Sequence, residues 1–121
     1  MPEIRRISTL EELDEVLERS HERPVWILKH SLACPVSSEA LREYRGFAEA
    51  ESRESVEFAL IEIQNARSVS QALAQRLGVR HESPQAILVG SERPLWHASH
   101  WQISSAALAS SSAEVLQEPA T

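Results

Sequence analysis

The sequence predicts an α/β domain with a central mixed β-sheet and helices on both of its faces. Short apolar runs rich in strand-forming residues alternate along the chain with segments of helical periodicity. The last two apolar runs are separated by a short turn, which is typical of a β-hairpin. The chain has 121 residues, of which 42% are hydrophobic, and this suits one domain with a single core.

The first half of the chain is expected to hold two strands and two helices. Residues 3–7 form a candidate edge strand, and residues 24–29 form a short apolar strand. A helix should follow Ser8 and Thr9, because a hydroxyl cap and early acids precede apolar residues at helical spacing. Those residues are Leu10, Leu13, Val16 and Leu17. A second helix is expected over residues 35–50, with Leu41, Tyr44 and Phe47 on one face.

The second half of the chain completes the pattern. The expected elements are a strand over 55–63, a helix over 68–77 ending at Gly78, a strand over 85–89, a turn over 90–93, a strand over 94–97 and a helix from about Ser104. Strands separated by helices predict parallel pairing, and the hairpin adds an antiparallel pair. The order β-α-β-α-β-α-β-β-α matches the thioredoxin fold. We expect one thioredoxin-like domain over 1–116 and a flexible C-terminal tail over 117–121.

Charge and composition exclude several classes of function. Eighteen acidic and twelve basic residues give a net charge of -6, which argues against nucleic-acid binding and against docking on anionic lipid. No apolar run has the ~20 residues that a membrane helix needs, and no secretory signal is evident. The single cysteine excludes an intramolecular disulfide. The cytoplasm, where thiols stay reduced, is the expected compartment.

Cys34 is the candidate nucleophile. It lies after a predicted strand and at the start of a predicted helix, and Pro35 suits the first helical turn because it lacks an N–H. A helix N-terminus favours negative charge, so the pKa of the thiol should be lowered. The alternative is that the lone cysteine is a small buried hydrophobic residue. The placement between strand, proline and helix favours the nucleophile.

Ser37 stands where a Cys-x-x-Cys motif would have its second cysteine. A serine cannot resolve a mixed disulfide, so the reaction must stop at a disulfide between Cys34 and another molecule. An external thiol must then complete it. Ser37 is a candidate hydrogen-bond donor to the thiolate, or an ordinary residue of the first helical turn.

Ser83 and Pro84 form the second informative site. They lie between the helix ending at Gly78 and the strand 85–89. The fold match predicts a cis-proline that faces the nucleophile, with the Ser83 backbone free to pair with an extended substrate. The alternative is a trans proline that starts a strand.

The remaining candidates are histidines, a lysine and two tryptophans. His30 and His81 are expected to flank the active site, where either could tune the thiolate. His97 and His100 lack an identifiable third ligand, so we expect no metal site. Lys29 could attract an anionic co-substrate or extend along the surface from a strand end. Trp96 and Trp101 could pack in the core or line a groove near the thiol.

Three segments resemble the monothiol bacilliredoxins, the bacillithiol-system redox-active proteins with a Thr-Cys-Pro-Ile-Ser motif. They are KHSLACPVS (29–37), GVRHESPQ (78–85) and WHASHW (96–101), in the family's order. The similarity extends from the first helix to about Leu108. Ala33 replaces the family's threonine, which removes a hydroxyl beside the nucleophile, and Val36 replaces isoleucine.

The resemblance implies a thiol–disulfide oxidoreductase that removes bacillithiol from S-bacillithiolated proteins. It implies Cys34 as nucleophile within the Cys34–Ser37 motif, Pro84 as the cis-proline, bacillithiol as co-substrate without a bound cofactor, and a flavin-dependent reductase that uses NADPH to recycle bacillithiol disulfide. The chain itself has no Gly-rich phosphate loop. Two alternatives stay open at this point: a monothiol oxidoreductase that uses glutathione, and a thioredoxin-like binding module without turnover.

Overall fold

The computed structural model describes residues 3–51 and 56–116, and it contains one five-stranded mixed sheet. The predicted tail over 117–121 lies outside the described residues. The strands are β1 (Ile4–Arg6), β2 (Val25–His30), β3 (Glu57–Glu62), β4 (Gln85–Gly90) and β5 (Arg93–Ser99). Their order across the sheet is β1-β3-β2-β4-β5.

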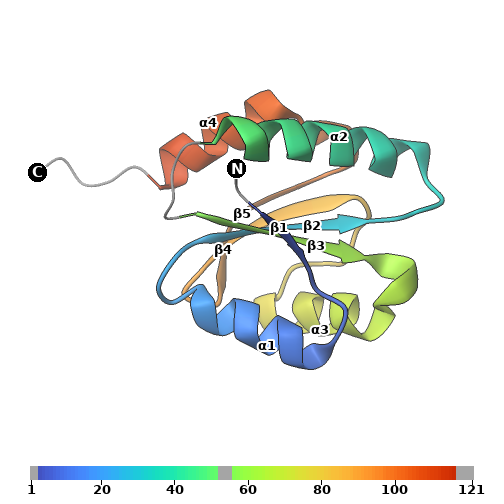
Figure 1. Ribbon diagram of the computed structural model, residues 1–121, viewed down its shortest axis with the longest axis vertical. Helices are drawn as coiled ribbons and strands as arrows, with labels where there is room; N and C mark the ends of the chain where they lie inside the picture. Colours follow the sequence, from blue (N-terminus) through green and yellow to red (C-terminus); the bar gives the residue numbers. More distant parts are fainter. Residues whose placement is uncertain (1–2, 52–55, 117–121) are drawn as a thin grey trace, which may run out of the picture.

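The α-helices of the described residues cover the sheet in two layers (Figure 1). They are α1 (Leu10–Arg19), α2 (Pro35–Ala50), α3 (Arg67–Leu77) and α4 (Ser105–Val115), with short 3-10 helices η1 (Ile63–Asn65) and η2 (His100–Gln102). Helices α1 and α3 lie on one face, and α2 and α4 lie on the other (Figure 1). This is the predicted α/β architecture. In the described part of the chain, no helix is long and apolar enough to cross a membrane.

Strand direction follows the prediction on one side of β2 but not on the other. β3 pairs in parallel with both β1 and β2, as crossovers through helices predict. β4 runs antiparallel to β2, although a helix also separates it from β3. The expectation of parallel pairing was wrong for β4. The chain leaving α3 enters the sheet at the end of β2, where Gln85 lies opposite Lys29, so β4 must run back along β2.

Local signals set the ends of the elements. Thr9 caps α1 through the amide of Glu12, and the Glu12 carboxylate accepts from the Thr9 amide, which completes a capping box. Gly78 adopts φ 67° as the C-cap of α3. Ser91 and Glu92 have positive φ in the tight turn between β4 and β5. Leu10, expected on the buried face, is 44% exposed because it is the first helical residue and precedes the turn that contacts the core.

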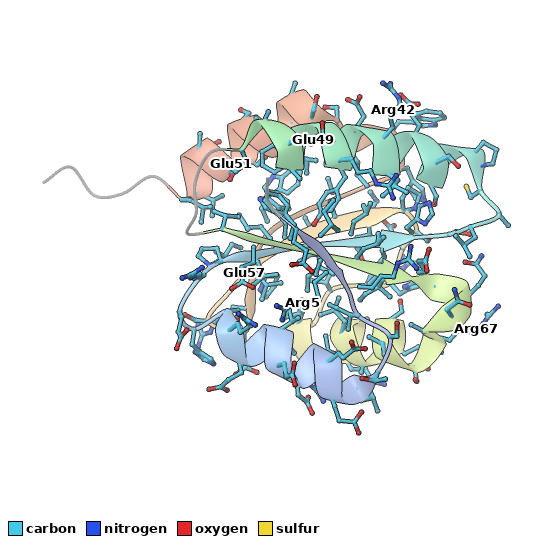
Figure 2. All side chains as sticks on the ribbon, viewed as in Figure 1. Arg5, Arg42, Glu49, Glu51, Glu57 and Arg67 are labelled. Carbon is cyan, nitrogen blue, oxygen red and sulfur yellow. The ribbon has the colours of Figure 1, made fainter. Side chains whose placement is uncertain are left out.

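The sheet separates two hydrophobic clusters, and Figure 2 shows side chains filling the space on both sides of it. Leu13, Val16 and Leu17 of α1 pack with Val69, Leu73 and Leu77 of α3 on one face. Trp26 of β2 makes edge-on contacts with Phe47 of α2 and Trp96 of β5 on the other, at centroid distances of 5.7 and 5.6 Å. Residues with alternate positions along β2 therefore face different helix layers.

Tyr44 fixes α2 on the sheet. Its side chain is fully buried, and its hydroxyl donates to the carbonyl oxygens of Trp26 and Ala59, each at 3.0 Å. These carbonyls belong to β2 and β3, so one hydroxyl ties the helix to two neighbouring strands. Burial raises the pKa of Tyr44 and keeps its proton in place.

Replacing Tyr44 by phenylalanine should destabilise the protein without changing its fold. Tyr44→Phe leaves two buried carbonyls without this donor, and the expected loss in the free energy of unfolding is about 1–3 kcal/mol. Urea denaturation measures this loss, with Ser38→Ala on the exposed surface of the same helix as control. A change within the error of the control would show that the tyrosine hydroxyl does not hold the helix.

Candidate active site

Cys34 lies at the point where the loop after β2 enters helix α2. Residues 31–34 form this loop, and Cys34 is the N-cap of the helix with φ −115° and ψ 123°. Pro35 occupies the first helical position, as expected from its missing N–H. The Cys34 side chain is partly buried, so it is accessible without being fully solvated. The structure therefore confirms the predicted placement of the thiol.

The helix start lowers the pKa of the Cys34 thiol. The largest cause is the backbone N–H of Ser37, followed by the N–H of Val36, and both point toward the sulfur. They act as oriented dipoles, since Cys34 makes no side-chain capping bond. Partial burial raises the pKa, but the dipoles outweigh it, and the Ser37 hydroxyl adds a smaller lowering. At a given pH, the thiol is therefore ionised to a larger extent than an ordinary cysteine.

Ser37 connects the helix to the loop that carries the thiol. The side chain is fully buried, and its hydroxyl accepts a hydrogen bond from the Ser31 amide at 3.1 Å. Because this bond occupies a lone pair, the hydroxyl proton remains free to point toward the sulfur of Cys34. Ser37 thus holds the loop and stabilises the thiolate with the same atom.

Gln64 forms a second support for the loop, and the sequence analysis missed it. Its Oε1 accepts from the Leu32 amide at 3.0 Å, and its Nε2 donates to the Ser31 hydroxyl at 2.8 Å. Gln64 lies in η1, after β3, about thirty residues along the chain from the loop. No motif or periodicity connects the two segments, so only the parallel register of β2 and β3 could have indicated this contact.

The other residues of the motif shape the surface around the thiol. Ala33 is exposed and Val36 is partly buried. Leu32 is 54% exposed and precedes them in the loop. Trp101 is 73% exposed in η2, so it does not belong to the core, whereas Trp96 packs against Trp26.

The peptide bond between Ser83 and Pro84 is cis, as the fold match predicted. It comes directly before Gln85, which lies opposite Lys29 near the end of β2. This register brings Pro84 to the same end of the sheet as the Cys34 loop. The Pro84 carbonyl accepts from the His100 amide at 3.0 Å. The Ser83 N–H and carbonyl make no hydrogen bond to any residue in 3–51 or 56–116.

Lys29 is buried, which corrects the expectation of a surface lysine near a strand end. Its relative exposure is 0%, because it shares a face of β2 with Val25 and Ile27 and points toward the α1–α3 layer. Its ammonium lies 3.2 Å from Nδ1 of His81. Burial lowers the pKa of Lys29 to about 8. An amine in this position cannot attract an anion from solvent.

The two histidines expected near the site lie in different environments. His81 is exposed, and its Nδ1 also lies 3.3 Å from the Ser70 hydroxyl of α3. His30 is buried, and its Nδ1 has no partner among the described residues. Burial lowers the pKa of both imidazoles, although Glu62 opposes this at His30 and Glu82 opposes it at His81. Neither histidine is among the groups that shift the pKa of Cys34.

The possible metal ligands gather away from the thiol. Among the described residues, Glu18, His21 and Glu92 have ligand atoms within 4.8 Å of one another, and all three are exposed. His21 Nε2 is already bonded to Glu92 at 2.5 Å. Glu92 lies in the β4–β5 turn, at the end of the sheet opposite to Cys34. His97 and His100 are not part of this group.

Removing the Ser37 hydroxyl should destabilise the thiolate form of Cys34 relative to the thiol. In Ser37→Ala the pKa of Cys34 should rise toward its ordinary value but stay below it, because the backbone N–H groups of Val36 and Ser37 remain. The rate of alkylation by iodoacetamide should therefore fall near neutral pH and approach the wild-type rate at high pH. Ser38→Ala, one residue further along α2, is the matched control. An unchanged pH profile would remove Ser37 from the site.

Replacing Lys29 should stabilise the protein in a pH-dependent manner. The pKa of about 8 in the folded state lies below the unfolded value, so the folded state binds fewer protons between these values and stability rises with pH there. At pH 7 the buried ammonium costs about 3 kcal/mol, and Lys29→Met should recover up to that amount. Urea denaturation from pH 7 to pH 10 should show the advantage shrinking. A variant less stable at every pH would contradict this account.

Comparison with known proteins agrees with this geometry. The sequence pattern of the family "Monothiol bacilliredoxin BrxC" matches residues 5–108. A solved structure assigned as an oxidoreductase with a thioredoxin fold has 28% identity and a TM-score of 0.77, over 89% of this chain and 92% of that one. Thioredoxin from Trypanosoma brucei brucei has 14% identity and a TM-score of 0.77, over 97% and 94% of the two chains. A mutant thioredoxin from Halobacterium salinarum NRC-1 has 20% identity and a TM-score of 0.74, over 98% and 95%.

The family match covers most of the chain and includes Cys34, Ser37 and Pro84. The structural neighbours share the overall fold of this chain, with TM-scores of 0.77 for two of them. The protein has the thioredoxin fold and belongs to the monothiol bacilliredoxin family.

Proposed function

We propose that this thiol–disulfide oxidoreductase removes bacillithiol from S-bacillithiolated proteins. One observation carries the proposal: the only cysteine of the chain lies at the N-terminus of α2, where backbone dipoles lower its pKa. The family supports the choice of bacillithiol as co-substrate. A thiolate that has no second cysteine beside it suits exchange that an external thiol completes.

In the first step, the Cys34 thiolate attacks the bacillithiol sulfur of the protein mixed disulfide. A disulfide forms between Cys34 and bacillithiol, and the client protein leaves as a thiolate that takes a proton from water. In the second step, the thiolate of another bacillithiol attacks the sulfur of the bacillithiol bound to Cys34. Bacillithiol disulfide leaves and Cys34 returns as a thiolate, so the client sulfur is reduced and the second bacillithiol is oxidised. An NADPH-dependent reductase would return that disulfide to thiol.

The surrounding residues have separate roles in this proposal. Ser37 stabilises the thiolate form of Cys34 and fixes the loop that carries it. Ala33 and Val36 line the approach to the sulfur. The free peptide groups of Ser83 can pair with an extended segment of the client, as an added strand does. Pro84 lies beside this segment. His81, which is exposed, can contact the substrate, whereas His30 is buried.

The proposal is tested by intact mass against time, with reduced protein offered bacillithiol disulfide and glutathione disulfide in parallel. We expect rapid formation of one bacillithiol adduct, cleared by added bacillithiol, and no adduct in Cys34→Ser. Fast reaction with glutathione disulfide alone would keep the oxidoreductase and change its thiol. If the wild type forms neither adduct, Cys34 is not activated and a binding module without turnover is the better account.

A further inference from the structure

A fully buried lysine lies five residues before the nucleophile, and the proposed reaction does not use it. Lys29 is the only lysine of the chain, and its relative exposure is 0%. Its ammonium faces an imidazole, with no carboxylate partner among the described residues. Burying a charge without a counter-ion is unfavourable. Residues that destabilise a fold are expected mainly at functional sites, which indicates a role of Lys29 other than packing.

The contacts of Lys29 connect β2 with the segment that leads to Pro84. Residues 80–84 form this segment, which we call the pre-β4 segment. Lys29 reaches it through Nδ1 of His81 at 3.2 Å, and Ser70 of α3 lies 3.3 Å from the same nitrogen. Gln85, opposite Lys29 on β4, donates from Nε2 to the Arg80 carbonyl at 3.0 Å. Two neighbouring side chains at one end of the sheet thus hold the start of the segment, at Arg80 and His81.

We propose that Lys29 is a positioning residue, which holds the pre-β4 segment through His81 at the location where a protein client pairs with Ser83. This inference rests on the proposed function and adds how the enzyme recognises the polypeptide part of its substrate. It predicts no effect on the sulfur chemistry, because Lys29 is not among the groups that shift the pKa of Cys34. A small disulfide, which lacks a peptide backbone to pair with Ser83, should therefore not require Lys29.

The contact between Lys29 and His81 depends on protonation. Nδ1 can accept from the ammonium only while the imidazole is neutral. The groups that face His81 are the Lys29 ammonium, which with burial lowers its pKa, the Glu82 carboxylate, which raises it, and the uncharged Ser70 hydroxyl. The neutral form is thus favoured near pH 7. Below the pKa of His81, an imidazolium would oppose the ammonium, and the segment would lose its anchor.

The test compares Lys29→Met with the wild type on two substrates. For a bacillithiolated client protein, KM should rise about tenfold or more, which corresponds to one lost anchoring contact. For bacillithiol disulfide, and for alkylation of Cys34, rates should stay within about twofold. Arg76→Met is the matched control, because it removes a positive charge from the exposed surface of α3. Since Lys29→Met should be at least as stable as the wild type at pH 7, a rise in KM cannot be attributed to unfolding.

Two variants of His81 test the pairing itself. His81→Leu removes the acceptor and should reproduce the defect of Lys29→Met, whereas His81→Asn keeps an acceptor and should recover most of the loss. In the wild type, the rate of client reduction divided by the rate of Cys34 alkylation should fall as the pH decreases through the pKa of His81, which lies below the ordinary value for histidine. In His81→Asn this ratio should not change with pH in that range.

The outcomes separate the two proposals. If the wild type reduces the client but Lys29→Met and His81→Leu have the wild-type KM, the positioning role is wrong and the proposed function stands. If Lys29→Met loses stability, client turnover and Cys34 alkylation together, Lys29 is a structural residue and the inference is also overturned. If the wild type turns over no bacillithiolated protein, the proposed function fails, and the inference fails with it.

Discussion

The antiparallel register between β2 and β4 is the constraint on which the site depends. Gln85 lies opposite Lys29, so β4 begins beside the end of β2. The loop that leaves β2 carries Cys34, and the segment that enters β4 carries Ser83 and Pro84. A parallel β4 would begin at the far end of β2 and leave the thiol without this neighbour. The direction of one strand therefore assembles a site from residues that lie about fifty positions apart.

The chemistry of the site comes from backbone rather than from charged side chains. The N–H groups of Val36 and Ser37 lower the pKa of Cys34, and they are available because the first turn of a helix has no carbonyl partners for them. Burial of the thiol acts in the opposite direction but is the smaller effect. Support from neighbouring residues then keeps the sulfur in place. Ser37 and Gln64 make three hydrogen bonds to Ser31 and Leu32 of the loop, and the Ala33 amide donates to the Ser31 hydroxyl within it. Such support from neighbouring elements is what a preorganised nucleophile requires.

Local features of the sequence predicted most of the fold. The helix from Pro35 to Ala50, the C-cap at Gly78 and the hairpin turn each depend on residues close together in the chain, and the structure has them where they were expected. The placement of Cys34 and the cis bond before Pro84 were also confirmed. The antiparallel direction of β4 was not predicted, because the rule for crossovers assumes that strands joined by a helix lie side by side. In this sheet β2 separates β3 from β4.

The site features that escaped prediction involve contacts between distant segments. Gln64 supports the loop from another element, and Lys29 contacts His81 across fifty-two positions. An exposed Trp101 and a buried Lys29 both reverse the ordinary preferences of their residue types. Periodicity assigns a residue to a face of a strand, but it does not predict which polar group from a distant segment contacts that residue. The roles of Ser83, His30 and His81 toward a substrate are predictions, and the variants of His81 test one of them.

The central claim is that the start of α2 converts Cys34 into a thiolate nucleophile. Absorbance of the thiolate at 240 nm, recorded against pH, measures its pKa directly. The titration is made in buffer and in urea that unfolds the chain, and the Cys34→Ser variant supplies the background. The account predicts a lower pKa in the folded protein than in the unfolded chain. An equal or higher pKa in the folded protein would contradict it, because the helix N-terminus would then have no net effect on the thiol.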